Sequence, residues 1–184
     1  MKRTIEEYVA YFRNMSEAQR EDYFMPEIQR CKNLQRRIGK QYCKKTLLHN
    51  KKRCIQLMVW APEGKTRPHE HLYRLVDKGA PATIYVLRGG IVQDLFAILD
   101  EGYEHLESNF HHAGDEPIIE DPSSIHRIGN ASLKDWTITI HEFVPGFQML
   151  VYDFGLNLIW IVDGKQDTLD SPPENALPIW PRAR

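Results

Sequence analysis

The chain has 184 residues, of which 42% are hydrophobic and 27% are charged, and its formal net charge is −1. This composition is ordinary for a soluble globular protein, and the length suits one domain, which we expect over residues 1–184. The near-neutral balance gives no electrostatic reason to expect a nucleic acid partner, and we interpret the basic excess in residues 1–53 as a solvated helical face.

Residues 1–40 are predicted to form a helical prefix. Four apolar side chains repeat at the spacing of one helix face: Ile5, Tyr8, Val9 and Phe12. Ser16 is typical of a helix N-cap and predicts the start of a second helix. Pro26 is predicted to interrupt that helix, so that a third helix covers residues 27–38 and ends at Gly39.

From residue 41 to residue 165 the pattern changes to short β-rich runs separated by turn sequences. The runs cover residues 54–60, 83–89, 91–99, 135–144, 148–154 and 156–164. Many short strands with no helices between them favour an antiparallel barrel or sandwich. We therefore predict an all-β core with an α-helical N-terminal extension. The Pro-rich segment 166–184 is expected to lie extended on the surface.

Two features of the sequence bear on location. No apolar run approaches the roughly 18 residues of a membrane span, and "MKRTIEEYVAYF" has no apolar segment of the kind found in secretory signals. The cysteines are odd in number and show no CxxC spacing, which argues against a disulfide framework: Cys31, Cys43 and Cys54. We expect a cytoplasmic protein without membrane contact.

The stretch "RPHEHLYR" places His69 and His71 two residues apart, directly after an apolar run and a turn. Side chains at i and i+2 share one face of a strand, so both rings would point the same way. His126 lies at another turn-to-strand junction, and an antiparallel barrel can bring it beside the pair. Three imidazoles would leave open positions on an octahedral metal ion. The alternatives are an accident of composition for the pair and a solvent-facing turn histidine for His126.

The other histidines divide into two groups. His141 lies mid-strand, and alternation puts Thr137, Thr139 and Phe143 on its face. It is either a core histidine bonded to Thr139 or a group at a cavity beside the metal. The remaining four lie in polar segments, which we interpret as turns, and are predicted to face solvent: His49, His105, His111 and His112.

Four segments, taken in order, resemble the cysteine dioxygenase family of cupins: "VWAPEGKTRPHEH", "YVLRGG", "SSIHRIGNAS" and "TIHEFVPGF". The resemblance covers roughly residues 42–155 and implies a cupin barrel, that is, a double-stranded β-helix or jelly roll. It implies a mononuclear non-haem Fe(II) held by His69, His71 and His126. It also implies a monomer that uses O₂ to oxidise a small thiol to its sulfinate.

The departures from the family concern the substrate. At the position of the carboxylate-binding Arg stands Lys45, although a shorter loop leaves Lys44 as an alternative. The Tyr position is Phe143 and the cross-linked Cys position is Thr83, so the family's Cys–Tyr cross-link cannot form. Tyr42 is a further candidate for contact with the substrate.

Residues 72–82 are longer than the family's usual link and carry Arg74, a candidate anion-binding group. An ordinary surface loop is the alternative, particularly for Asp77 and Lys78. We therefore predict a thiol dioxygenase whose substrate is a small thiol other than L-cysteine, bearing an acid group. Two alternatives stay open: a metal-dependent cupin enzyme acting on a non-thiol carbon substrate, and a non-catalytic cupin that senses a ligand or a metal.

Overall fold

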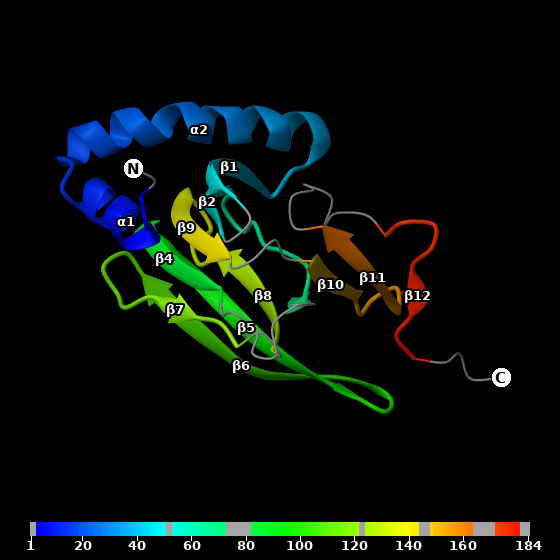
Figure 1. The fold of residues 1–184 in the computed structure, drawn as a ribbon. Coiled ribbons are helices and arrows are strands. Elements are labelled where there is room, and N and C mark those ends of the chain that lie inside the picture. The colour runs from blue at the N-terminus through cyan, green and yellow to red at the C-terminus, as the bar shows by residue number, and fades with distance from the viewer. Residues whose placement is uncertain are drawn as a thin grey trace.

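The computed structural model describes residues 3–50, 53–72, 82–121, 124–143, 148–163 and 172–180. Within these ranges two helices precede a series of strands (Figure 1). The helices are α1 (Ile5–Arg13) and α2 (Glu17–Ile38). The strands are β1 (Tyr42–His49), β2 (Cys54–Trp60), β3 (His69–Leu72), β4 (Thr83–Arg88), β5 (Gly90–Leu99), β6 (Gly102–His112), β7 (Ile118–Ile119), β8 (Ile125–Asn130), β9 (Thr137–Phe143), β10 (Gln148–Asp153), β11 (Leu158–Asp163) and β12 (Leu177–Pro178).

Both helices begin at capping boxes. In α1 the Thr4 side chain accepts from the backbone N–H of Glu7, whose carboxylate accepts from the N–H of Thr4. Ser16 and Gln19 form the same reciprocal pair at the start of α2. At the other end of α2, Gly39 adopts φ 70° and closes the helix, a left-handed conformation that glycine reaches without a steric penalty.

The prediction that Pro26 separates two helices was wrong, because α2 runs through it without a break. The ring of Pro26 is exposed, while Phe24 and Ile28 on either side of it are buried on the barrel. Cys31, one turn further on, is also buried. Packing on both sides of the proline therefore stabilises a continuous helix in spite of the hydrogen bond that proline cannot donate.

The strands form two antiparallel sheets that curl into a barrel (Figure 1). One has the order β1-β2-β9-β4-β7 and the other the order β12-β11-β10-β3-β8-β5-β6. This confirms the predicted fold class at the level of architecture, an all-β barrel of the double-stranded β-helix type with a helical N-terminal extension. No helix among the described residues is long and apolar enough to cross a membrane.

Strand β2 is apolar on both faces, apart from Gln56, because both faces are covered. All seven of its residues are buried. Ile55, Leu57 and Val59 pack under the two helices, while Met58 and Trp60 face the interior of the barrel. In Figure 1 the helices lie over the sheet that contains β1, β2 and β9. Burying an apolar side chain of this size is worth about 1.5–3 kcal/mol, so this layer is a main source of stability.

Several strands lie outside the runs predicted from the sequence: β1, β3, β6, β7, β8 and β12. The long β6 pairs with β5 along its whole length, from Gly90↔His112 to Leu99↔Gly102. Most of its side chains are exposed, so it lacks the apolar alternation of a half-buried strand. The expectation that His105, His111 and His112 lie in turns is corrected accordingly, and His111 is half-buried rather than open to solvent.

The described part of the C-terminal segment docks on the barrel. Strand β12 pairs with β11, and the indole N–H of Trp180 donates to the carbonyl of Leu99 at 2.9 Å. The side-chain amide of Asn157 donates to the carbonyl of Trp180 at 3.0 Å and its oxygen accepts from the Trp180 N–H at 2.9 Å. The segment is therefore held by specific hydrogen bonds although many of its side chains are exposed.

Asn130, the last residue of β8, ties that strand to the ends of β2 and β9. Its amide donates to the carbonyls of Ala61 at 3.0 Å and Asp135 at 2.7 Å. Its oxygen accepts from the Ser132 N–H at 2.9 Å and from the Thr137 hydroxyl at 2.8 Å. The side chain is 7% exposed, and the bonds to Ala61 and Thr137 are buried, so these two partners would lose a bond where water has little access.

We expect Asn130→Ala to lower the free energy of unfolding by about 2–4 kcal/mol, because buried donors and acceptors are left unsatisfied. Urea denaturation measures the change. Asn109→Ala is the matched control: its amide donates to Glu107 on β6, and it should shift stability by no more than about 0.5 kcal/mol. Equal effects of the two substitutions would contradict the role given to Asn130.

Candidate metal site

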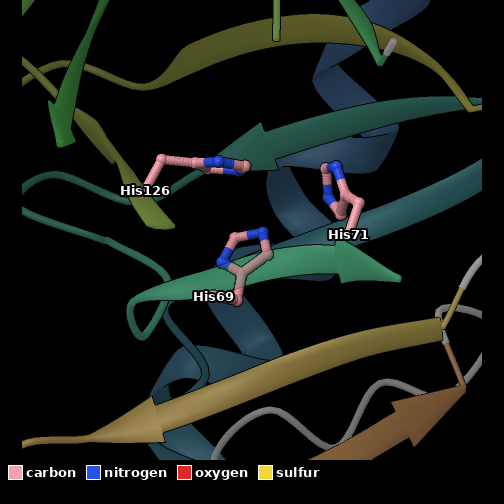
Figure 2. Close-up of side chains that lie close together, drawn as sticks. All are labelled: His69, His71 and His126. Atoms are coloured by element: carbon pink, nitrogen blue, oxygen red, sulfur yellow. The ribbon is translucent and has the colours of Figure 1, made fainter. Parts of the chain in front are cut away.

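Strands β3 and β8 bring three histidines together. His69 and His71 are buried on one face of β3, and Glu70 and Leu72 lie on the other face, as the alternation predicts. Strand β8 is the antiparallel neighbour of β3, with His69 directly opposite His126. Figure 2 shows the three rings turned toward one shared space. Their candidate ligand atoms all lie within 4.8 Å of one another, and the ring centroids are 4.5–5.2 Å apart.

Backbone carbonyls determine which ring nitrogen of His69 and of His126 carries the lone pair. His69 Nδ1 lies 2.9 Å from the carbonyl oxygen of Arg67, and His126 Nδ1 lies 3.2 Å from that of Ser124. A neutral imidazole that donates from Nδ1 carries a lone pair on Nε2. These two contacts therefore orient the rings and leave each Nε2 able to bind a cation, the arrangement common to metal-ligating histidines.

Burial keeps these rings uncharged. His69, His71 and His126 are 5%, 4% and 1% exposed. Desolvation lowers the pKa of His69 to about 4, with Lys44 adding to the effect. Desolvation also holds the pKa values of His71 and His126 well below the usual range, and there the neighbouring imidazoles add to it. All three are neutral at pH 7, which is the form that binds a metal.

One residue beside this cluster was not predicted from the sequence. Glu120 follows β7 and is 2% exposed. Its Oε2 lies 3.4 Å from Nδ1 of His71 and its Oε1 lies 3.3 Å from Nε2 of His126. Burial raises the pKa of this carboxyl to about 8. The only signal in the sequence was its spacing of two from Ile118, which put both side chains on one face.

The opposite wall of the site belongs to β9. Trp60 Nε1 donates to the Thr139 hydroxyl oxygen at 2.8 Å, and that oxygen lies 2.7 Å from His141 Nε2. Indole N–H is a donor only, so the hydroxyl hydrogen is free to be donated to His141. Desolvation lowers the pKa of His141 to about 3, so this ring is neutral as well. The His141 ring also lies between Trp60 and Phe143, with centroids 6.2 and 5.8 Å away.

The histidines open onto a cavity inside the barrel of about 30 Å³. The lining is mostly apolar, with contributions from both sheets: Met58, Ile84, Ile128, Phe143 and Met149. The polar side chains on it include Lys44, Thr66, Glu120 and His141.

Two adjacent lysines of β1 point in opposite directions. Lys44 stands opposite Met58 and lines the cavity, with its ammonium 5.9 Å from the ring centre of Tyr42. Lys45 faces α2, where its ammonium lies 2.8 Å from a carboxylate oxygen of Glu27. Lys45 therefore lies away from the cavity, contrary to its predicted place in the site, and strand alternation turns Lys44 toward the cavity instead.

The other predicted substrate contacts fall in three classes. Tyr42 and Phe143 line the cavity, and the Phe143 ring lies 5.4 Å from that of His71. Thr83 does not line it, because the inward side chain of that part of β4 is Ile84; the expectation for Thr83 is corrected. Arg74 lies outside the described residues, together with the rest of 73–81.

No family model and no curated protein matches this chain. Among solved structures, a conserved protein with a double-stranded β-helix domain from Klebsiella pneumoniae is 18% identical, with a TM-score of 0.44 over 60% of this chain and 79% of that one. An RmlC-like cupin from Ralstonia eutropha is 18% identical, with a TM-score of 0.48 over 68% of each chain. Oxalate oxidase in complex with glycolate is also 18% identical, with a TM-score of 0.44 over 60% of this chain and 56% of that one. These are likenesses of fold, and no activity passes from them to this chain.

We expect His126→Ala to weaken binding of Co(II) or Fe(II) by more than about 100-fold, beyond the cost of losing a supporting group. Anaerobic titration followed by metal analysis after gel filtration measures this. His141→Ala should keep most of the metal, and His105→Ala, on exposed strand β6, should bind as the unchanged protein does. Full metal occupancy in His126→Ala would overturn the assignment of this histidine.

Proposed function

We propose that this protein is a mononuclear non-haem iron thiol dioxygenase, similar to the cysteine dioxygenases, that oxidises a small thiol bearing an acid group. The observation that supports it most is the convergence of three neutral, buried imidazoles on a cavity that also holds a lysine. The four sequence segments that resemble the family supply the reaction class. A set of three histidines that leaves positions open fits a non-haem Fe(II).

The reaction balances without a further reductant. The thiol and O₂ give a sulfinate and one proton: the S–H bond breaks, two S–O bonds form, and sulfur supplies the four electrons that O₂ accepts. Bound Fe(II) would supply adjacent positions for a thiolate and O₂ and would lower the pKa of the thiol. Holding both reactants at one place replaces an encounter in solution by a fixed geometry.

The residues of the chain then have separate tasks. His69, His71 and His126 would hold the metal and, being neutral, would leave its charge available to an anionic thiolate. The apolar lining excludes water from the reacting sulfur. Thr139 and His141 form the polar part of the β9 wall, where the hydrogen bond from Trp60 holds them in place beside the ligands.

Lys44 is the group we assign to the acid end of the substrate. It is a cationic side chain on the cavity wall, and an ammonium attracts a carboxylate as a point charge. The resembled family has a Tyr at the position of Phe143, and Phe143 offers no hydroxyl to orient a substrate. Orientation of the substrate would therefore depend mainly on Lys44. This is the reason to expect a thiol other than L-cysteine as the preferred substrate.

A second candidate function is a metal-dependent enzyme acting on a non-thiol carbon substrate. The observation in its favour is Glu120, since a carboxylate beside three imidazoles also suits metals other than iron. The two functions differ in a measurable product, because only the thiol reaction yields a sulfinate.

The deciding experiment is O₂ uptake by the Fe(II)-reconstituted protein with a panel of thiols: cysteine, cysteamine, 3-mercaptopropionate, mercaptosuccinate and homocysteine. We expect uptake with at least one acid-bearing thiol, together with a product heavier by two oxygen atoms in mass spectrometry. The His126→Ala protein is the negative control. Iron-loaded protein that consumes no O₂ with any of these thiols would overturn the proposal in favour of the second candidate or a non-catalytic ligand sensor.

For the substrate contact, we expect Lys44→Met to raise the KM for 3-mercaptopropionate about tenfold or more, as loss of one charged contact at roughly 1.5–3 kcal/mol implies. The KM for uncharged 2-mercaptoethanol should change little. Lys45→Met is the matched control, since its exposed ion pair with Glu27 contributes little. An unchanged KM in Lys44→Met, or a larger rise in Lys45→Met, would refute the assignment.

A further inference from the structure

The carboxylate of Glu120 is buried against His71 and His126, but no hydrogen bond to either ring compensates its burial. Neither of its oxygens has a hydrogen-bond partner among the described residues. Buried carboxylates are normally paired or bound to a cation, because desolvating them alone is costly. A group in this state, aimed at a cluster of ligand atoms, points to a missing positive charge.

The contact between Glu120 and His126 shows where such a positive charge would lie. Nδ1 of His126 lies 3.2 Å from the carbonyl oxygen of Ser124 and must carry the hydrogen to donate to it. Nε2 of the neutral ring therefore presents a lone pair to Glu120 Oε1, 3.3 Å away. Two acceptors that face each other at this distance repel unless a proton or a metal cation lies between them, and an ion bound by the three histidines would take that place. On the other side, Oε2 lies 3.4 Å from His71 Nδ1, so the carboxylate spans two members of the cluster.

We propose that Glu120 is a fourth protein ligand of the metal, which makes the donor set three nitrogens and one oxygen. The histidines come from β3 and β8 of one sheet, while Glu120 follows β7, at the edge of the other sheet. Its place is held by its own backbone, since the Glu120 N–H donates to the carbonyl of Ala82 at 2.9 Å. A bound ion would therefore be held by residues from both sheets of the barrel.

This assignment narrows the substrate class of the proposed thiol dioxygenase, and the narrowing rests on that proposed function. A six-coordinate ion with four protein ligands keeps two positions. These two positions would suffice for one thiolate sulfur and O₂, with no position remaining for an amine of the substrate. The substrate then binds the metal through sulfur alone, and Lys44 holds the acid end. The amino group of an aminothiol such as cysteine would therefore not add to the affinity of the substrate for the metal.

The number of open positions can be counted without thiol or O₂. The full-length protein is loaded with Mn(II), and electron–nuclear double resonance in H₂O and D₂O counts the exchangeable waters on the ion. We expect no more than two waters in the unchanged protein and one more in Glu120→Ala. Three waters in the unchanged protein would overturn the assignment, whatever the variants do.

Metal affinity gives an independent reading on the same samples. Glu120→Gln should weaken Mn(II) binding by more than about tenfold. Glu70→Gln is the matched control: this carboxylate lies between His69 and His71 in the sequence but accepts from the Tyr152 hydroxyl on the opposite face of β3, at 2.9 Å. Equal affinities of the Glu120→Gln, Glu70→Gln and unchanged proteins would refute the proposal.

The substrate consequence is tested by comparing kcat/KM for cysteine and for 3-mercaptopropionate, which differ by the amino group. We expect 3-mercaptopropionate to match or exceed cysteine. A preference of more than tenfold for cysteine would refute binding through sulfur alone. If no thiol is oxidised while the water count stays at two, the proposed function fails and the four-ligand assignment stands, so the two failures are distinguishable.

Discussion

The site depends on one register, the pairing of β3 with β8 that sets His69 opposite His126. A slip of one residue would turn every side chain of β3 to the other face and leave Glu70 where the histidines now lie. The ladder is fixed just before β3 as well. Thr66 donates its backbone N–H to the carbonyl of Ile128 at 2.8 Å, and its hydroxyl accepts from the Ile128 N–H at 3.1 Å. The turn before the histidine pair is thus part of the positioning.

The helical extension has a role at a distance from the cluster. It covers the outer face of β2 and β9, so that these two central strands are buried on both sides. A strand confined in this way has little freedom to twist or slide, because packed interiors resist deformation. Strand β9 carries Thr139 and His141, whose position relative to β3 therefore depends on the layer formed by α1, α2 and the sheet beneath them.

Much of the fold and of the candidate site could be predicted from patterns among residues that are close in the sequence. Helix caps, the alternation of β9 and the spacing of His69 and His71 follow from rules that need only neighbours in the chain. Features that depend on pairing between distant strands could not. Which of Lys44 and Lys45 faces inward is decided by the register of β1 on β2, which contains an irregularity after Thr46.

Glu120 is a second residue whose place could not be predicted from its neighbours in the chain. Its sequence neighbours read as an acidic turn, and only the two pairs between β7 and β4 carry it to the histidines. Pro26 is the opposite case, where a local rule was overridden by tertiary contacts on both sides of the residue. Local patterns therefore identified the metal-ligand candidates, whereas the carboxylate and the inward lysine required the assembled barrel.

The β5–β6 hairpin extends away from the body of the barrel in Figure 1, and β6 ends its sheet as described. The outer backbone groups of such an edge strand are a template for adding a foreign strand, and Leu106 and Phe110 on it are 55% and 64% exposed. Glu104 and Glu107 on the same strand, both exposed, place negative charge along this edge. These like charges repel the same edge of a second molecule, so the exposed side chains of β6 themselves oppose edge-to-edge pairing of two folded barrels.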